Sequence, residues 1–201
     1  VKNFLLLSTT QVYGTQKGRE PIRETNPEKG SSNYVDLKLT SEKYMMKSFK
    51  KSDTVPVIAR VAPVYTAEYT QNLRDRVYDY KDDVAYIYKD GEYGFSFCCV
   101  FNLIDFINGI INIPEGRYEG IYNVSDSRMI TAKEILDYER DHHRIGAVIQ
   151  RNPGVGISFN KSKAKTDYRY FDPASTFNNW NIDNTRARRI APFRWTLKNT
   201  K

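Results

Sequence analysis

Two apolar runs, separated by a polar stretch with helical spacing, set the strongest constraint on how this chain can fold. The first run covers residues 4–7 and gives way to hydroxyl side chains at Ser8. The second covers residues 55–61. Continuous apolar runs of this length are typical of strands buried on both faces, as in parallel sheets. We therefore expect strands at about residues 3–8 and 56–61 in one parallel sheet, joined by a crossover helix.

The stretch between these runs carries a tyrosine and a lysine one helical turn apart. Tyr34 and Lys38 would share one face of a helix that continues through Glu42 to about Phe49. An ammonium group beside a phenol favours the phenolate, so the pair is suited to proton transfer. The same spacing also fits an amphipathic helix with a solvated lysine, because the chain contains 15 Tyr. By itself, the spacing leaves both interpretations open.

Several motifs, taken together and in order, resemble one known family. They are S-T-T-x-V-Y-G at 8–14, P-I-x-E at 21–24, Y-x-x-x-K-x-x-x-E at 34–42, Arg60 with Val64-Tyr65, Asp90-Gly91, Tyr122-Asn123-Val124 and, more weakly, residues 183–189. Over roughly residues 2–138 the chain resembles the extended short-chain dehydrogenase/reductases, the NAD-dependent sugar-nucleotide epimerases and dehydratases. The resemblance implies an α/β fold, with part of a Rossmann-type parallel sheet and a smaller C-terminal substrate-binding lobe.

The resemblance also implies how the chain is divided. Residues 1–66 would be the C-terminal part of the dinucleotide-binding domain, and residues 67–201 mainly the substrate-binding lobe, with 120–138 returning to the sheet. A half with a glycine-rich fingerprint would precede Val1, because the sequence has no G-x-G-x-x-G that opens a helix. We interpret the glycine pair at 154–156 as a loop. We therefore expect a C-terminal portion that needs the other half to bind NAD or NADP.

The resemblance assigns roles to individual side chains. Tyr34 would exchange the proton of a sugar hydroxyl while hydride moves to or from the nicotinamide. Lys38 would favour the phenolate and hold the nicotinamide ribose, and Thr9 would hydrogen-bond the reacting oxygen. These three residues and Ala62 would contact the cofactor. The residues implied to bind a nucleotide-sugar-like substrate are Gln11, Tyr65 and Asn72.

The residues that follow Thr9 favour one class of reaction. Family members that eliminate water carry an Asp and a Glu there, because elimination needs an extra acid and an extra base. This chain has Thr10 and Gln11, and neither can serve. We expect an NAD-dependent epimerase or a simple oxidoreductase rather than a 4,6-dehydratase.

Other departures from the family pattern bear on the substrate. Pro63 stands where Asn is usual, Phe95 where an Arg binds phosphate, and Ser96 where an Asp follows it. Asn102 ends the triplet that replaces V-D-D. Arginine is the residue best suited to a diphosphate. These departures keep a second hypothesis open, in which the fold serves as a non-catalytic binding or interaction module.

Composition limits the remaining classes. With 40% hydrophobic and 27% charged residues the chain is globular, and no apolar stretch is long enough to cross a membrane. The two cysteines, Cys98 and Cys99, are adjacent, which suits a structural disulfide poorly and favours a reducing cytoplasm. We expect no metal site, because adjacent histidines such as His142 and His143 point about 100° apart on a helix. A homodimer is left open.

The formal charge of +7 is concentrated late in the chain. The basic residues there are Lys161, Lys163, Lys165, Arg169, Arg186, Arg188 and Arg189. Clustered cations can neutralise nucleic-acid phosphates. We place a solvated surface first, a rim for an anionic sugar nucleotide second and nucleic acid last, so a nucleic-acid partner is not expected.

The other predicted elements follow from local patterns. They are a helix over 72–80, a strand over 84–88 closed by the Asp90-Gly91 turn, a strand over 95–101, a helix over 102–111 capped by Asn102, a strand over 120–124, and a helix to about residue 138 opened by a capping box from Thr131 to Glu134. From residue 142 to residue 170 the pattern fades, and we assign no element there.

Overall fold

A three-stranded parallel sheet, in the order β1-β2-β8, forms the centre of the larger part of the molecule. The computed structural model describes residues 2–14, 16, 20–80, 83–88, 90–112, 118–151 and 181–200. The strands of the sheet are β1 (Asn3–Thr9), β2 (Val55–Val61) and β8 (Gly120–Val124). The two apolar runs are therefore neighbouring parallel strands, as predicted, and the predicted strand at 120–124 completes the sheet.

The carboxyl ends of these strands meet at one edge of the sheet. Thr9 lies opposite Val61 in the β1–β2 pair, and Val61 lies opposite Val124 in the β2–β8 pair. Ligands of open α/β sheets bind beyond such an edge. The register thus brings the end of β1 and the start of the segment after β2 to the same place.

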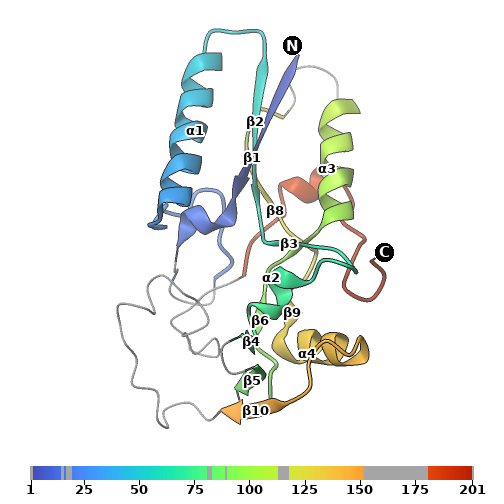
Figure 1. Cartoon of the computed structure of the whole chain (residues 1–201). Coiled ribbons are helices and arrows are strands. Elements are labelled where there is room, and N and C mark those ends of the chain that lie inside the picture. Colours follow the sequence, from blue (N-terminus) through green and yellow to red (C-terminus); the bar gives the residue numbers. More distant parts are fainter. Residues whose placement is uncertain are drawn as a thin grey trace.

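Helices cover the two faces of the sheet, which gives the predicted three layers (Figure 1). The helices are α1 (Asn33–Phe49) and α3 (Val100–Asn112). The helix α1 is the crossover between β1 and β2, and Ser32 caps it by accepting a hydrogen bond from the Val35 N–H at 3.2 Å. On the other face, Phe106 of α3 packs on Tyr122 of β8, with 5.8 Å between ring centroids.

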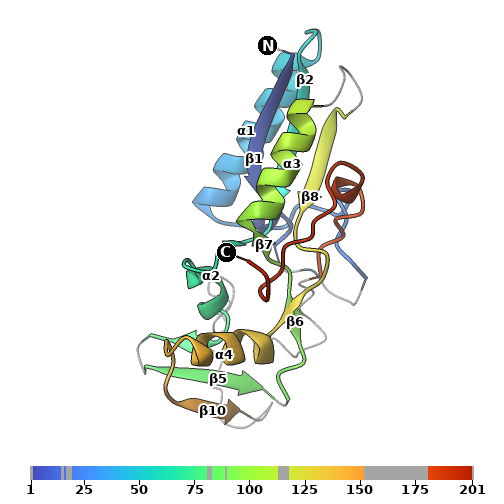
Figure 2. The same ribbon diagram turned by 90° about the vertical axis from the view of Figure 1, so that its right-hand side faces the viewer.

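A smaller lobe lies beyond the carboxyl ends of the sheet strands (Figures 1 and 2). Its elements are α2 (Gln71–Arg74), β4 (Tyr78–Asp79), β5 (Val84–Tyr88), β6 (Gly94–Phe95), β9 (Ile130–Thr131), α4 (Ala132–Asp141) and β10 (Val148–Arg151). It holds a β10-β5-β4 sheet and an antiparallel β6–β9 pair. Leu73, Phe97 and Ile135 are fully buried in a core of its own. The boundary between residues 66 and 67 stays a prediction.

Two short strands connect the sheet to the lobe. They are β3 (Val64–Tyr65) and β7 (Cys98–Cys99), which pair in parallel. Figure 1 shows β3, and Figure 2 shows β7, between the two parts. Tyr65 is fully buried in the core of the lobe, and Cys98 is fully buried in the core of the sheet. The two cores are therefore joined through this strand pair.

Two local predictions for the lobe are confirmed. A turn follows β5, with Gly91 at φ +77°, a conformation that favours glycine. The capping box of α4 is complete, because Thr131 Oγ1 accepts from the Glu134 N–H at 3.1 Å and the Thr131 N–H donates to Glu134 Oε2 at 3.0 Å. The helix then runs three residues further than predicted, to Asp141.

Three other predictions were wrong. The helix expected over 72–80 is the single turn α2 followed by β4, because Val77 and Tyr78 are drawn into the core of the lobe. The strand expected over 95–101 is broken into β6 and β7, and α3 begins at Val100. Asn102 is therefore no cap. It lies inside the first turn of α3, fully buried, and donates to Asp126 Oδ1 at 2.7 Å.

The last described segment returns to the sheet. Ile182 forms a parallel bridge with Ile22, and η3 (Ala187–Arg189) follows it. Phe193 then packs against Phe106 of α3, with 6.5 Å between ring centroids. The glycine pair at 154–156 and the lysines at 161–165 lie outside the described residues. Among the helices that the structure describes, none has the length and apolar character needed to cross a membrane.

Candidate active site

The end of β1 places a hydroxyl at the carboxyl edge of the sheet. Thr9 is only 6% exposed and begins η1 (Thr10–Tyr13), where its Oγ1 accepts a hydrogen bond from the Gln11 N–H at 3.2 Å. A threonine hydroxyl that accepts one hydrogen bond still has its own proton to donate. The strand end therefore offers a positioned donor.

The predicted proton-transfer pair lies on α1 beside β1. Lys38 Nζ is 5.6 Å from the centroid of the Tyr34 ring, so the two side chains are in contact on one face of the helix. The same ammonium donates to the Leu7 carbonyl at 2.9 Å, two residues before Thr9. The Tyr34 side chain is 49% exposed. The structure thus brings Tyr34 and Lys38 together and anchors Lys38 to the strand that ends in Thr9.

A buried ion pair fixes this helix to the sheet. Glu42 lies one turn after Lys38, accepts a hydrogen bond from Ser8 Oγ, and receives Arg60 Nη2 of β2 at 2.7 Å. Arg60 is 1% exposed and also bonds Glu28. Burial alone would lower the pKa of Arg60, but the hydrogen bonds to Glu42 and Tyr13 hold it above its usual value. Arg60 therefore stays charged, and its contacts with Glu42 lock α1 against β2.

Sequence reasoning named Glu42 and Arg60 as parts of motifs but did not predict that they pair. The signal was present, because Arg60 is the one charged side chain in the apolar run of β2. A charge in a buried strand needs a partner of opposite sign. The glutamate on the inner face of the crossover helix was the nearest candidate.

A second buried network explains the V-Y-G and Y-N-V motifs. Tyr13 is 1% exposed, and its hydroxyl donates to Asn123 Oδ1 at 2.7 Å. The Asn123 amide then donates to the carbonyls of Ile22 and Asp183, at 3.1 and 3.2 Å. Gly14 closes the motif at φ +59°, where an added Cβ would lie 2.7 Å from the backbone of Gly30. These motif residues hold loops around the site rather than reach into it.

Three other predicted site residues differ from one another in exposure and in their contacts. Ala62 is 1% exposed, directly after β2, and its N–H donates to the Val124 carbonyl at 2.9 Å. Gln11 is exposed in η1. The Asn72 amide on α2 donates to the Val64 carbonyl at 2.7 Å. All three lie near the carboxyl edge or in the segments that leave it. Their contacts with a cofactor or substrate stay predictions.

Tyr65 differs from the rest, because it is fully buried and its hydroxyl donates to Asp126 Oδ2 at 2.7 Å. The other oxygen of Asp126 accepts from the Cys99 N–H and from the Asn102 amide, both at 2.7 Å. Burial raises the pKa of the Asp126 carboxyl to about 6, against the opposing effect of these donors. This acid, which the motif analysis missed, joins β3, β7 and α3 behind the site.

An arginine from another segment lies beside Phe95, the residue that stands where the family has its phosphate-binding arginine. Phe95 is 3% exposed, in β6, and the Arg76 guanidinium carbon is 5.6 Å from the centroid of its ring. The same guanidinium lies 5.9 Å from the ring of Phe97. Arg76 lies between α2 and β4, a segment that the sequence pattern assigned to a helix. A cation therefore lies over the ring of Phe95 even though the residue itself is apolar.

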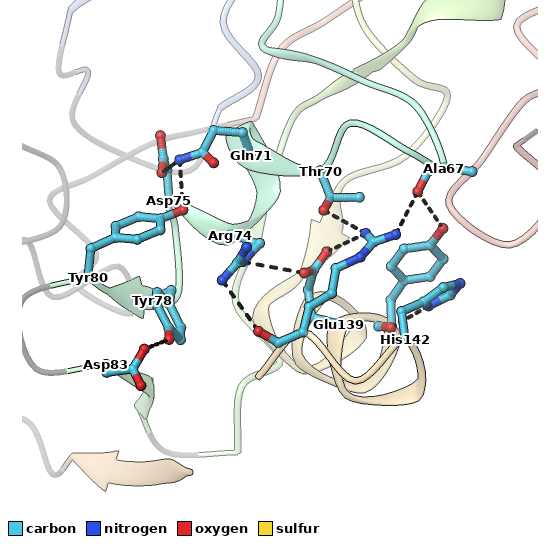
Figure 3. A network of polar contacts seen from close by, with 12 residues as sticks. Ala67, Thr70, Gln71, Arg74, Asp75, Tyr78, Tyr80, Asp83, Glu139 and His142 are labelled. Carbon is cyan, nitrogen blue, oxygen red and sulfur yellow. Dashed lines mark hydrogen bonds and ion pairs between the residues drawn. The ribbon is translucent and has the colours of Figure 1, made fainter. Parts of the chain in front are cut away.

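A buried carboxylate ties α2 to α4 in the lobe (Figure 3). Glu139 is fully buried, with its oxygens 3.5 Å from Arg74 Nε and 3.4 Å from Arg144 Nη1. Arg144 also donates to Thr70 Oγ1 at 2.8 Å and to the Ala67 carbonyl at 3.1 Å. The network holds α2, and with it Asn72, against α4.

The described residues contain no group of His, Cys, Asp and Glu side chains that could hold a metal ion. His142 stacks on Tyr138, with 4.2 Å between ring centroids, and its Nδ1 lies 2.7 Å from the Tyr138 carbonyl. Its neighbour His143 adopts φ +54° at the end of α4. The two histidines therefore close a helix end.

No protein-family model matches the sequence, and a comparison with curated proteins finds no match. Solved structures match through the fold. The UDP-glucuronic acid 4-epimerase of Bacillus cereus, in complex with NAD, is 16% identical with a TM-score of 0.69, and the match covers 100% of this chain and 59% of that one. The UDP-glucose 4-epimerase of Thermotoga maritima, with UDP-glucose, is 17% identical with a TM-score of 0.65 and covers 100% and 61%.

A third neighbour carries out another reaction. The NAD-dependent NDP-hexosamine 5,6-dehydratase TunA is 16% identical with a TM-score of 0.60, and the match covers 94% of this chain and 57% of that one. The fold is thus the one seen in NAD-dependent sugar-nucleotide epimerases and dehydratases, as the motifs predicted. This chain spans about three fifths of the length of these neighbours.

Proposed function

We propose that this chain is the proton-transfer and substrate-binding part of an NAD-dependent, epimerase-like oxidoreductase that acts on a nucleotide sugar. The observation that carries the proposal is the contact of Tyr34 with Lys38, on a helix that Glu42 and Arg60 lock beside the strand ending in Thr9. A positioned proton-transfer residue needs such support from surrounding side chains.

Each residue of the set has one task in this proposal. The Tyr34 oxygen takes the proton from a sugar hydroxyl and later returns it, and the Lys38 ammonium beside its ring would hold the nicotinamide ribose. Thr9 donates its hydroxyl proton to the reacting sugar oxygen. Bound NAD would accept and return the hydride. With Ala62, the same three residues would contact the nicotinamide end of NAD or NADP.

The residues around the site fit this cofactor only in part. Tyr34 is half exposed at the sheet edge, so its phenol is accessible. The pyrophosphate, by contrast, needs a glycine-rich turn before a helix, and the sequence has none. We infer that a dinucleotide-binding half, outside this sequence, supplies that part of the site.

The substrate in this proposal is a nucleotide sugar, as in the neighbours with bound UDP-glucose and UDP-glucuronic acid. Gln11 and Asn72 would bind it directly, whereas Tyr65, the third predicted residue, is fully buried with its hydroxyl on Asp126 and would support the site from behind. Thr10 and Gln11 favour epimerisation or oxidation over loss of water. A homodimer and a cytoplasmic location stay part of the proposal.

One observation supports the alternative of a non-catalytic binding module. Phe95 is buried where the family has its phosphate-binding Arg, and the amide of Asn102 is fully used in contacts to Asp126 and Trp195. These two features are expected of a chain that has lost its substrate contacts but has kept its internal hydrogen-bond networks. The two functions differ in whether Tyr34 transfers a proton.

The test is Tyr34→Phe in a protein that includes a dinucleotide-binding half, assayed with UDP-glucose and UDP-glucuronic acid. Removing a positioned proton-transfer group is expected to lower kcat by about 10² to 10⁴, with NAD affinity little changed. Tyr69→Phe is the control, because Tyr69 is 55% exposed and lies outside the proposed set. Wild-type turnover by Tyr34→Phe would leave the binding module as the better explanation.

A further inference from the structure

The described chain up to Thr131 passes between the sheet and the lobe three times. The first passage, residues 62–66, leaves β2 through β3, and the second, residues 96–99, returns from β6 through β7 to α3. The third, residues 125–129, runs from β8 to β9. The first two passages pair as β3 and β7 over only two residues each. So short a strand pair leaves the angle between the sheet and the lobe to other contacts.

One buried carboxylate bonds all three passages. Asp126 lies on the third passage and is 5% exposed. Its Oδ2 accepts a hydrogen bond from the Tyr65 hydroxyl of β3, and its Oδ1 accepts from the Cys99 N–H of β7, both at 2.7 Å. The Asp126 N–H donates in turn to the Phe97 carbonyl, also at 2.7 Å. Because the group is buried, little water competes for these hydrogen bonds.

Asn102 extends the contacts of Asp126 to a fourth segment. Its amide donates to Asp126 Oδ1 at 2.7 Å and to the Trp195 carbonyl at 2.8 Å, and its oxygen accepts from the Trp195 N–H at 3.0 Å. At this point the C-terminal segment passes from Phe193, in the core of the sheet, to Leu197, in the core of the lobe. The acid and the amide together therefore bind four segments that run between the two cores.

Directional contacts at this junction have an effect that apolar packing lacks. The sheet and the lobe have separate cores, and apolar surfaces in contact can slide, because hydrophobic attraction has no direction. Hydrogen bonds weaken steeply when their angle changes. The contacts of Tyr65, Asp126 and Asn102, which we call the junction network, therefore resist rotation of the lobe on the sheet.

We propose that Asp126 is a positioning residue, which fixes the angle between the lobe and the sheet through the junction network. Tyr34 and Lys38 of the proposed proton-transfer set lie on α1, beside the sheet, and Asn72 lies on α2 of the lobe. A nucleotide sugar bound between them would meet the proton-transfer residues correctly at one angle only, since small displacements of reacting groups slow catalysis strongly. This consequence rests on the proposed function, whereas the fixed angle does not.

The angle is tested on the full chain with two nitroxide labels, at Lys47→Cys on α1 and at Asp137→Cys on α4. Both positions are exposed, and the native cysteines are fully buried. Double electron–electron resonance should give a narrow distance distribution for the labelled parent. Asp126→Ala should broaden it at least about twofold, because three buried donors lose their common acceptor. Asp126→Asn should restore it, because an amide can accept from two of these donors and donate to the phenol.

The matched control is Glu139→Gln. Glu139 is likewise a buried carboxylate, but its partners Arg74 and Arg144 both belong to the lobe, so the variant should lose stability without broadening the distribution. Tyr65→Phe removes one contact of Asp126 and replaces Asp126→Ala if that variant does not fold; it too should broaden the distribution. The parent's width in the variant that is measured, or equal broadening by Glu139→Gln, would overturn the proposal.

The consequence for catalysis is measured with UDP-glucose in a protein that includes a dinucleotide-binding half. Asp126→Ala should lower kcat/KM by about 10- to 100-fold with NAD affinity unchanged, and Asp126→Asn should restore it. An unchanged kcat/KM beside a broadened distribution, or an equal loss of NAD affinity, would refute the positioning role. An inactive parent protein would count against the proposed function alone, and the distance measurement would then decide the present proposal.

Discussion

Asp126 shows how one buried acid can couple the stability of this fold to pH. Its oxygens accept hydrogen bonds from Tyr65, Cys99 and Asn102, which come from three different elements. Three donors lower the cost of burying a carboxylate but do not remove it, because desolvation is the largest effect on this group and raises its pKa to about 6. Asp126 is therefore protonated at a higher pH in the folded chain than in the unfolded chain.

The sign of the pH dependence follows from that shift. The folded chain binds this proton more tightly than the unfolded chain, whose carboxyl has a pKa of 3.8. The associated stability is fully present below about pH 4 and is lost as pH rises through about 6. The largest loss is about 3 kcal/mol, from a shift of about two pKa units.

Asp126→Asn should remove this contribution, because an amide keeps an acceptor for Cys99 and Asn102 without an ionisable proton. Urea unfolding of both proteins between pH 4 and pH 7 is the measurement. The free energy of unfolding of the wild type should fall relative to the variant as pH rises across this range. Parallel curves for the two proteins would show that Asp126 is not the coupled group.

At the scale of single elements, one buried ion pair holds α1 against the sheet. Glu42 is 4% exposed and Arg60 is 1% exposed, and they join the helix to β2. Removing one partner of a buried ion pair costs about 3 to 5 kcal/mol, since the other charge stays buried. This contact also keeps Lys38 in place beside Leu7.

Glu42→Gln is therefore expected to lower the free energy of unfolding by about 3 kcal/mol. The matched control is Glu28→Gln, because Glu28 bonds the same Arg60 but its side chain is 33% exposed. That variant should lose less than about 1 kcal/mol. Chemical denaturation of the two variants gives the comparison. A similar loss in both would mean that burial does not decide the contribution of these carboxylates.

The elements differ in how well the sequence predicts them, and the reason is physical. The strands β1 and β2 and the helix α1 carry strong local patterns, and the motifs around Thr9, Tyr34 and Lys38 come in one order. The lobe does not, because its core draws side chains from short segments. The apolar run at 95–101 fits a buried strand and a buried helix equally well, and only tertiary packing starts α3 at Val100.

Contacts between distant segments were the least predictable part of the site. The pairing of Glu42 with Arg60, the position of Arg76 over Phe95 and the donors around Asp126 all join residues from different elements. No spacing along the chain encodes such contacts. Only Arg60 carried a signal in the sequence, because a charge within the apolar run of β2 needs a partner.

On the scale of the whole molecule, the starts of the described helices bear on the prediction that this chain alone binds a dinucleotide weakly. A pyrophosphate binds where N–H groups at a helix start are open. Here Ser32 Oγ accepts from the first turn of α1, and Thr131 Oγ1 does so in α4. At the start of α3, Asp126 accepts from the Cys99 N–H and adds a negative charge. At each of these helix starts, one N–H group therefore already has an acceptor within the chain.

The 201-residue chain should accordingly bind NAD weakly, with a dissociation constant above roughly 1 mM. Tyr34, Lys38 and Thr9 would contact only the nicotinamide end, and the pyrophosphate would stay in water. The measurement is isothermal titration of NAD into the chain alone and into a protein that includes a dinucleotide-binding half. Lys38→Met should weaken NAD binding only in the longer protein. Micromolar affinity of the chain alone would mean that a pyrophosphate site exists within it, and the division of labour between two halves would be wrong.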